Sequence, residues 1–481
     1  MTPARARRPR SGPRRFPPPG DVVEQVLERS KSDGCIVVVE ESSEVETRFA
    51  NNTTTTDGAR RQRRVTVISI RGGRNGMSVG AASRSGDPDV EDLVRASEAD
   101  AADAPSAEDA SPLVGPDVGG AGRPGAGPPF AEPARQTEFA VLGGVLAALG
   151  RAFEEARGKG HVLAGFASHR LETAYLGTST GLRRRHEQPT GSIELVARTA
   201  DGASSSWVSA GTPWFEDVDL ADLHRTVEQR LAWSTRRIEL PAGRYETILP
   251  PDATADLMVS LVEAMSGRDA EDGRNAFSAP GGATKVGQSL SSLPFELRSD
   301  PQEPGLECAP FVVAGASGTD VSVFDNGLPL GRTAWVEDGV VRRLRYHRAG
   351  AARSGVPVTP PVDNIVLQLP GAGGNLEDLV AGTSRGLLLT CLWYIREVDP
   401  VTLLLTGLTR DGVYLVEDGA VVAAVNNFRF NESPLGVLSR AVQAGRSERA
   451  LSREWGEWMN RSAMPALRVA EFNMSSVSAA T

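Results

Sequence analysis

The residues best suited to catalysis are few and widely spaced in this chain. Its five histidines include one His-Glu pair, His186 with Glu187. A zinc-binding helix requires a second histidine about one helical turn beyond such a pair. None follows here, and Pro189 would break the helix. We therefore predict that the pair lies in a surface strand or turn.

Residues 177–181 match Gly-x-Ser-x-Gly, the pattern of a hydrolase nucleophile elbow. Such an elbow places its serine between a strand and a following helix. The arginines at 183–185 and the Pro-Thr-Gly turn at 189–191 make a helix unfavourable at this place. We predict a β-turn and no serine nucleophile.

Cys391 lies in the most apolar segment of the chain, residues 387–395. A free cysteine in such surroundings usually behaves as a small buried hydrophobe. The functional alternative is a reactive thiol near a peptide groove, with His347 as its base. Thiol catalysis needs a lowered pKa, whereas apolar neighbours raise it, so the buried interpretation is favoured. Cys35 and Cys308 are distant in sequence and form no Cys-x-x-Cys motif, so neither a disulfide framework nor a thiolate zinc site is expected.

The densest polar cluster after a predicted strand consists of Asn426, Asn427, Arg429 and Asn431. Amide and guanidinium groups suit the binding of an extended peptide's backbone or carboxylate. A capped turn whose polar groups satisfy one another is an equally good interpretation. Both interpretations stay open from the sequence.

Hydrophobic patterning predicts the elements that must position these residues. Apolar residues at helical spacing and short apolar runs alternate along the chain. Helices are predicted at 21–31, 88–99, 139–158, 219–233 and 253–266, and strands at 35–40, 45–51, 64–71, 161–168, 172–176 and 192–198, with 53–61 as a polar turn. The fold is therefore predicted to be multi-domain α+β, with mixed or antiparallel sheets.

Composition suggests where the units begin and end. Residues 101–134 are dominated by Ala, Asp, Pro and Gly and offer little apolar surface for burial. We predict an Arg/Pro-rich disordered tail at 1–20, an α/β domain at 21–100, a linker or long surface loop at 101–134, a middle α+β domain at 135–238 and a strand-rich domain at 239–481. The tail could also reflect an upstream start codon, or it could be an arm that contacts nucleic-acid phosphates.

The overall charge and hydropathy exclude several classes of protein. With 52 basic and 61 acidic side chains the net charge is −9, so no broad basic surface for nucleic acid is expected. No apolar run reaches the roughly 18 residues that a membrane-spanning helix needs. A protein of the reducing cytoplasm fits this composition.

Three segments carry a family resemblance: Arg-Phe-Ala-Asn-Asn at 48–52, Asp-Pro-Val-Thr-Leu at 399–403 and Asn-Asn-Phe-Arg-Phe-Asn-Glu-Ser-Pro at 426–434. In these segments the chain resembles the TldD/PmbA family of intracellular peptidase subunits. The resemblance extends from about residue 21 to the C-terminus and implies a TldD/PmbA-like fold. In the peptidase branch a helix carries His-Glu-x-x-x-His, whose imidazoles bind zinc and whose glutamate activates water, and a later cysteine adds a ligand.

The segment that matches this zinc motif is Val-Glu-Ala-Met-Ser-Gly at 262–267. Val262 and Gly267 stand in place of the two imidazoles, and no cysteine stands near Gly407, where the third ligand is expected. Only Glu263 matches, either as a relic of the catalytic residue or as an ordinary helix residue. The resemblance therefore implies that this chain binds no metal and has no confident catalytic residue.

This pattern is similar to the non-catalytic branch of the family, called TldE or PmbA. The resemblance implies a heterodimer with a zinc-bearing TldD-like subunit, or a homodimer, that encloses a chamber for degrading or trimming unfolded or modified peptides. Two alternatives remain: a peptidase that is active alone through an unrecognised site, and a regulatory binding protein of the gyrase-modulator type. No cofactor is expected in this chain, and no specific nucleic acid or membrane is expected as a partner.

Overall fold

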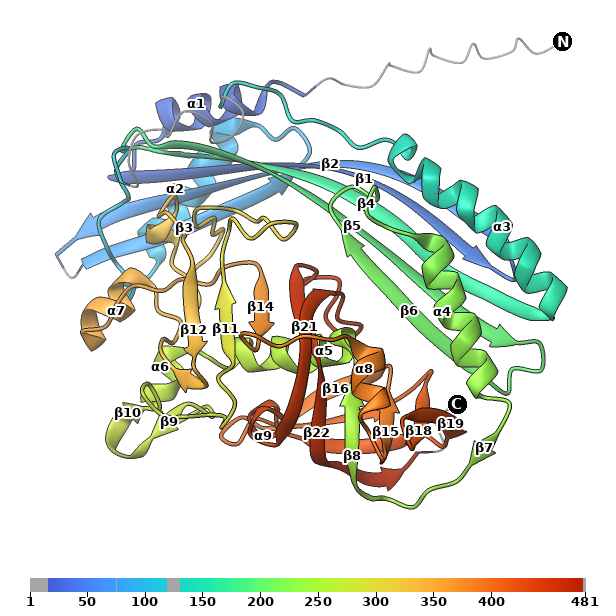
Figure 1. The fold of residues 1–481 in the computed structure, drawn as a ribbon. Helices are drawn as coiled ribbons and strands as arrows, with labels where there is room; N and C mark the ends of the chain where they lie inside the picture. The colour runs from blue at the N-terminus through green and yellow to red at the C-terminus, as the bar shows by residue number, and fades with distance from the viewer. Residues whose placement is uncertain (1–15, 75, 119–129, 479–481) are drawn as a thin grey trace, which may run out of the picture.

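The computed structural model describes residues 16–74, 76–118 and 130–478. Most of the tail predicted at 1–20 lies outside these residues, and the first helix already begins at Pro19. Within the described residues, the N-terminal half builds one six-stranded antiparallel sheet in the order β3-β2-β1-β4-β5-β6. Its strands are β1 (Gly34–Ala50), β2 (Thr53–Gly73), β3 (Gly76–Ser85), β4 (His161–Thr178), β5 (Arg183–Thr199) and β6 (Ser205–Thr212). Figure 1 shows these long strands arching over the C-terminal part of the molecule.

Three predicted strand boundaries were wrong, all inside this sheet. The polar turn predicted at 53–61 is the first half of β2, which pairs with β1 from Ala50↔Thr53 onward. The turn consists of Asn51 and Asn52 alone, with φ angles of 52° and 57°, the conformation that a two-residue hairpin favours. The start of β2 is exposed, so its polar sequence carries no alternating apolar signal. Likewise, the strands predicted at 35–40 and 45–51 are one strand, β1, and the strands predicted at 161–168 and 172–176 are one strand, β4.

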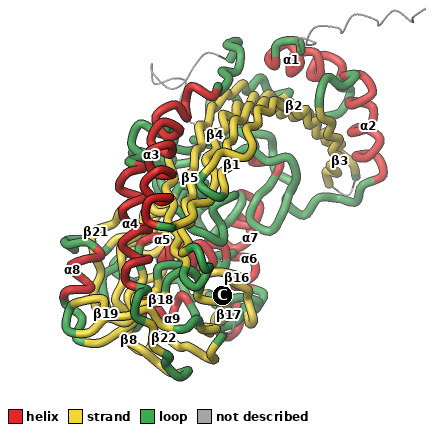
Figure 2. The backbone as a smooth tube through the Cα atoms, turned by 90° about the vertical axis from the view of Figure 1, so that its right-hand side faces the viewer, coloured by secondary structure: helices red, strands yellow, loops and turns green. Residues whose placement is uncertain are grey.

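Helices cover the outer face of the sheet at both ends. They are α1 (Pro19–Arg29), α2 (Val90–Asp103), α3 (Gly143–Lys159), which follows a short 3-10 turn, η1 (Phe139–Leu142), and α4 (Leu220–Trp233). Val22 and Val26 of α1 pack on Val37 and Val39 of β1. At the other end, α3 and α4 pack on β1, β4 and β5 (Figure 2). The units predicted at 21–100 and 135–238 therefore contribute strands to the same sheet.

The stretch predicted to be a linker is packed along its first described part. Residues 104–118 contain no helix or strand apart from an isolated bridge between Ser106 and Ser78. Val114 is nevertheless buried against Ile36 and Ile68 on the inner face of the sheet, in a cluster that also includes Phe324 of the C-terminal half. This stretch therefore fills space between the two halves of the molecule.

The C-terminal half contains a mixed sheet. Within the described residues it has 14 strands, with a main path β13-β12-β11-β14-β22-β8-β15-β18-β19-β7 from which β16, β17, β20 and β21 branch. The strands are β7 (Arg237–Ile238), β8 (Gly243–Leu249), β11 (Glu296–Ser299), β12 (Thr333–Glu337), β13 (Val340–Val341), β14 (Ile365–Gln368), β15 (Arg385–Leu389), β16 (Leu392–Asp399), β17 (Leu404–Thr409), β18 (Val413–Glu417), β19 (Ala420–Val425), β20 (Phe428–Glu432), β21 (Ala441–Ala450) and β22 (Ser462–Val477), and a separate hairpin joins β9 (Ser278–Ala279) to β10 (Ala283–Thr284). Three pairings, β14–β22, β15–β8 and β19–β7, are parallel. The predicted α+β class with mixed sheets is confirmed.

One helix, α5 (Pro251–Glu263), is buried inside this half, where most of its side chains join the largest core. Shorter helices surround it: α6 (Gly267–Glu271), α7 (Arg348–Ser354), α8 (Leu376–Ala381) and α9 (Pro434–Ser439). Among the described residues, none of the helices combines the length and the apolar character needed to cross a bilayer.

Candidate functional site

The segment that matches the zinc motif, residues 262–267, lies at the junction of α5 and α6. Helix α5 ends at Glu263, and α6 begins at Gly267 with Ser266 as its N-cap. The Val262 side chain is 5% exposed and packs in the C-terminal core. Positions 262 and 267 therefore present no nitrogen, sulfur or oxygen side-chain donor to a metal ion.

The ring of Tyr346 fills the space in front of Gly267. A Cβ atom at Gly267 would lie within 3.0 Å of the Tyr346 ring atoms Cζ, Cε1 and Cε2, a separation that real Cβ atoms do not show. The ring is held in place because its hydroxyl donates a hydrogen bond to Glu271 Oε1 at 2.8 Å. Burial raises the pKa of Tyr346, so this hydroxyl stays protonated. No imidazole fits at position 267 while Tyr346 keeps this position.

Glu263 is engaged in an ion-pair chain. Arg345 Nη1 lies 3.0 Å from Glu263 Oε1, and Arg345 Nη2 lies 2.9 Å from Asp320 Oδ2. The Arg345 guanidinium is buried, whereas the Glu263 side chain is 46% exposed. The carboxylate that would activate water in a peptidase is thus directed toward a guanidinium group.

The residues present do not fit the family's zinc ion. At the expected third ligand position, a Cβ on Gly407 of β17 would lie within 3.0 Å of the Phe430 ring. Across the part of the chain that the structure describes, His, Cys, Asp and Glu side chains form no group of three that could hold a metal ion. We therefore derive no catalytic step through zinc in this chain.

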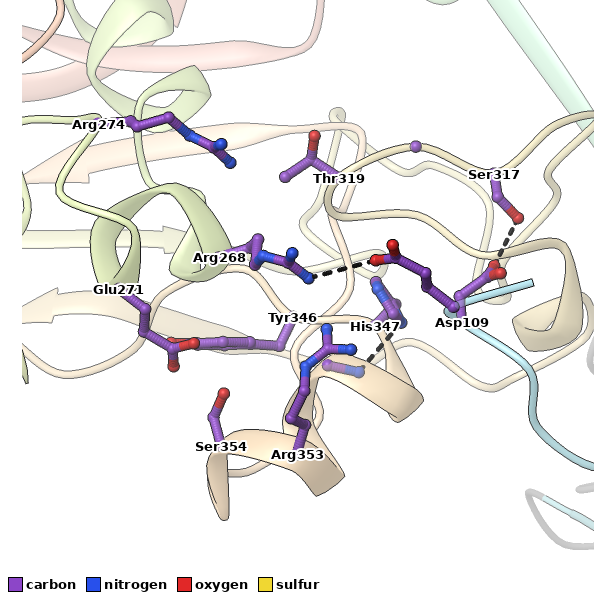
Figure 3. Close-up of a pocket in the computed structure, with 13 residues that line it drawn as sticks. Asp109, Arg268, Glu271, Arg274, Ser317, Thr319, Tyr346, His347, Arg353 and Ser354 are labelled. Carbon is purple, nitrogen blue, oxygen red and sulfur yellow. Dashed lines mark hydrogen bonds and ion pairs between the residues drawn. The ribbon is translucent and has the colours of Figure 1, made fainter. Parts of the chain in front are cut away.

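A cavity of about 290 Å³ opens beside the α5–α6 junction. We call it the Tyr346 cavity and define it by Asp109, Arg268, Glu271, Tyr346, His347 and Arg353 (Figure 3). Its walls come from α6, from the loop at 317–319, from α7 and from the packed stretch at 104–118. No motif marks these residues in the sequence, because they come together only when distant segments pack.

Cys391 lies in the interior, away from the Tyr346 cavity. The residue is 1% exposed, and its Sγ lies 2.7 Å from Arg453 Nη1. Burial raises the pKa of the thiol to about 12, although the neighbouring Arg453 guanidinium opposes the shift. His347, the base considered for this thiol, instead caps α7, where its Nδ1 accepts a hydrogen bond from Gly350 N.

The structure divides the predicted asparagine and arginine cluster. Asn426 and Asn427 line a second cavity of about 230 Å³ at the seam between the two halves, together with Ser205 and Asp411. Asn426 Oδ1 accepts a hydrogen bond from Leu240 N at 2.7 Å.

The other two members of the cluster lie on the following strand, β20. Phe428 and Phe430 of β20 are buried, whereas Arg429 is exposed and Asn431 is partly buried on the opposite face. Arg429 Nη1 donates to Thr406 Oγ1 at 3.3 Å, and Asn473 Nδ2 donates to Asn431 O at 3.1 Å. The cluster therefore forms two local environments, of which the one at Asn426 and Asn427 borders a cavity.

Ser179 and His186, the two remaining residues that resemble parts of catalytic motifs, have structural roles. Ser179 lies in the predicted turn, between β4 and β5, where its Oγ accepts a hydrogen bond from Cys35 N at 3.0 Å. His186 is on β5, and its Nε2 lies 2.9 Å from Gln188 Oε1. The predicted turn is present from Ser179 onward, after β4 ends at Thr178. Of the predicted surface strand or turn for His186, the structure shows a strand, but the residue is partly buried.

These features define a multi-domain α+β protein whose buried central helix lacks the ligands of a metal site. Two family models match the chain: the PmbA/TldA metallopeptidase central domain over residues 143–235 and the PmbA/TldA metallopeptidase C-terminal domain over residues 242–476. Together they span well over half of the sequence, and the chain belongs to the PmbA/TldD family. The family predicted from the sequence is confirmed.

Solved structures share the fold at low sequence identity. TldE from Thermococcus kodakarensis superposes with a TM-score of 0.76 at 18% identity, covering 94% of this chain and 98% of that chain. A protein described as a "putative modulator of a DNA gyrase" from Thermotoga maritima has a TM-score of 0.72 at 15% identity, with 94% and 99% covered. A "putative modulator of DNA gyrase" from Bacteroides thetaiotaomicron has a TM-score of 0.74 at 15% identity, with 95% and 98% covered. No curated protein matches the chain significantly in sequence.

Proposed function

We propose that this chain is a non-catalytic, TldE-type subunit of a cytoplasmic peptidase complex. In this proposal a TldD-like partner carries the zinc and the water-activating glutamate. This chain shapes the chamber in which unfolded or modified peptides are degraded or trimmed. The proposal rests on family membership together with the altered junction at residues 262–267.

The observation that carries the proposal is the packing of Tyr346 on Gly267. A lost ligand can leave an open pocket that is available to other donors. Here the ring occupies the place of the missing side chain, because even a single Cβ would collide with it. The ion pair between Arg345 and Glu263 supports the same conclusion, since one carboxylate oxygen of Glu263 already contacts a guanidinium group.

The test is zinc content and hydrolysis of an unstructured peptide. Three samples are compared: the purified chain, a relative that contains His-Glu-x-x-x-His, and their mixture. We expect the chain alone to be free of zinc and inactive, and the mixture to be more active than the relative alone. Stoichiometric zinc or turnover by the purified chain would overturn the proposal.

Two matched variants assign the activity of the mixture to one subunit. Replacing the glutamate of the relative's zinc motif by glutamine should abolish hydrolysis. Glu263→Gln in this chain should leave the rate unchanged, because Glu263 contacts Arg345 in place of a water nucleophile. A large loss of activity with Glu263→Gln would instead assign Glu263 a catalytic role.

A regulatory binding function is the second candidate. Two of the solved structures with this fold carry the description "putative modulator" of DNA gyrase. A supercoiling assay with purified gyrase tests it, and a change in rate at stoichiometric amounts of this chain would favour that function. A third possibility, a peptidase that uses Cys391, is disfavoured because burial raises the pKa of the thiol.

A further inference from the structure

The cationic side chains of the Tyr346 cavity are paired, with one exception. Arg268 Nε lies 3.0 Å from Asp272 Oδ2, and Arg268 Nη1 lies 3.7 Å from Glu108 Oε2. Arg274 Nη2 lies 2.8 Å from the same Asp272 carboxylate. Arg353 lines the cavity, and within the described residues it has neither an ion pair nor a hydrogen bond. Among the described residues, it is the one arginine of this wall without a direct ion pair.

The anionic side chains of the cavity already have donors. Asp109 Oδ2 accepts hydrogen bonds from Ser317 Oγ at 2.6 Å and from Ser322 Oγ at 2.7 Å. Glu271 Oε1 accepts the hydroxyl of Tyr346 at 2.8 Å. These neutral donors leave the carboxylates charged, but among the described residues neither of them, nor Glu108 on the same wall, forms an ion pair with Arg353.

His347 adds a buried donor to the same wall. The residue is 6% exposed, and its Nδ1 accepts the Gly350 N–H at 3.2 Å. A neutral imidazole that accepts through Nδ1 carries its proton on Nε2. Among the residues that the structure describes, Nε2 has no hydrogen-bond partner. Figure 3 shows Arg353 extending from α7 toward Tyr346 and His347.

We propose that the Tyr346 cavity binds the C-terminal carboxylate of a peptide through Arg353, with His347 Nε2–H as a second donor. A guanidinium group binds a carboxylate through two parallel hydrogen bonds, which suits a single unpaired arginine. Pockets for small ligands begin at about 300 Å³, so the cavity has room for a terminal residue rather than for a long segment. That this carboxylate belongs to a peptide is an assumption that rests on the proposed function.

A free phosphate presents the same oxyanion chemistry, so the experiment must separate the two sources. Binding of an unstructured peptide, labelled at its N-terminus, is measured by fluorescence anisotropy with the chain alone. The peptide is used with a free C-terminal carboxylate and with a C-terminal amide. Inorganic phosphate is then added as a competitor.

We expect the free acid to bind about tenfold more tightly than the amide, the effect of one charge-assisted interaction. Arg353→Gln should remove this difference, and Arg353→Lys should restore only part of it, because lysine keeps the charge and loses the paired donors. Arg151→Gln is the matched control. Arg151 is also an exposed helical arginine without a partner among the described residues, so its replacement should leave the difference intact.

Three outcomes overturn the inference. The first is equal binding of acid and amide, and the second is a preference for the acid that survives Arg353→Gln. The third is phosphate binding that depends on Arg353 without any preference for the acid, which would assign the cavity to phosphate. Because the assay uses neither zinc nor the partner, failure here leaves the subunit proposal standing. Turnover by the chain alone would instead overturn the subunit proposal.

Discussion

The ring of Tyr346 lies directly against the backbone of Gly267, the position that the sequence resemblance matches to a zinc-binding histidine of the peptidase branch. The ring atoms are so close that a Cβ at Gly267 would approach them within 3.0 Å. Gly267 is thus required by packing, and the altered zinc motif is part of a filled interior. This relationship can be tested directly by mutation.

Gly267→Ala should destabilise the protein, because the added methyl group collides with a ring that is buried and hydrogen-bonded. Overpacking of this kind costs about 1–3 kcal/mol. The free energy of unfolding is measured by denaturant titration. The control is Gly150→Ala in α3, where no atom lies within 4 Å of the new Cβ. That substitution should be neutral or stabilising by up to about 1 kcal/mol, and similar losses in both variants would contradict the packing argument.

Two substitutions in the hairpin turn between β1 and β2 distinguish the effect of backbone conformation on stability from the effect of side-chain hydrogen bonds. Asn51 and Asn52 both have positive φ angles, which glycine adopts freely. Asn52 also donates from Nδ2 to His161 O at 2.8 Å and accepts from Leu163 N at 2.7 Å. Asn51→Gly should therefore change stability by less than about 0.5 kcal/mol, whereas Asn52→Gly should cost about 1–3 kcal/mol. Thermal and denaturant unfolding measure both, and equal effects would show that the two hydrogen bonds contribute little.

Asp256 on α5 should make stability depend on pH. Burial raises the pKa of Asp256 to about 8, despite hydrogen bonds from Ser452 Oγ and Glu454 N to its Oδ1. In the unfolded chain its pKa is about 3.9. Between these values the folded protein holds a proton that the unfolded chain releases. This group therefore lowers the free energy of unfolding by up to about 1.4 kcal/mol for each unit of rising pH.

Asp256→Asn removes this pH dependence. The free energy of unfolding of the variant, relative to that of the unmodified protein, should therefore increase as the pH rises from 5 to 8. Urea titrations at several pH values measure the difference, and parallel profiles would contradict the prediction. Asp201 provides a control of opposite sign. Hydrogen bonds from Ala203 N and Thr199 Oγ1 lower the pKa of Asp201. Asp201→Asn should therefore lose relative stability at neutral pH, and the loss should vanish as the pH falls through that lowered pKa.

The thiols should be unreactive in the folded protein. All three cysteines are free and buried. Burial raises the pKa to about 11 for Cys35 and to about 12 for Cys308 and Cys391. Because the thiolate is the reactive form, a thiol reagent at pH 7.5 should label none of them in the native state and all of them in denaturant. Rapid labelling of native Cys391, identified by peptide mass, would revive a thiol-based activity.

Local sequence patterns predicted the elements that have one buried face. The spacing of Val22 and Val26 predicts α1, because in a helix both side chains lie on the same side, where they pack on β1. The start of β2 could not be predicted in this way. It is exposed, and only its pairing with β1 holds it extended. The packed stretch around Val114 was missed for a related reason, because its partners Ile36 and Phe324 are distant in sequence.

The sequence by itself determined that positions 262 and 267 carry no metal donor, because a valine or glycine side chain has no atom that can bind zinc. Only the tertiary structure decided what replaced the donors. Tyr346 fills the space at Gly267, Arg345 pairs with Glu263, and Arg353 on the cavity wall has no ion pair within the part of the chain that the structure describes. Residue type sets the chemistry that a side chain can perform. Its neighbours, and the charges that remain unbalanced, depend on packing between segments that no local pattern connects.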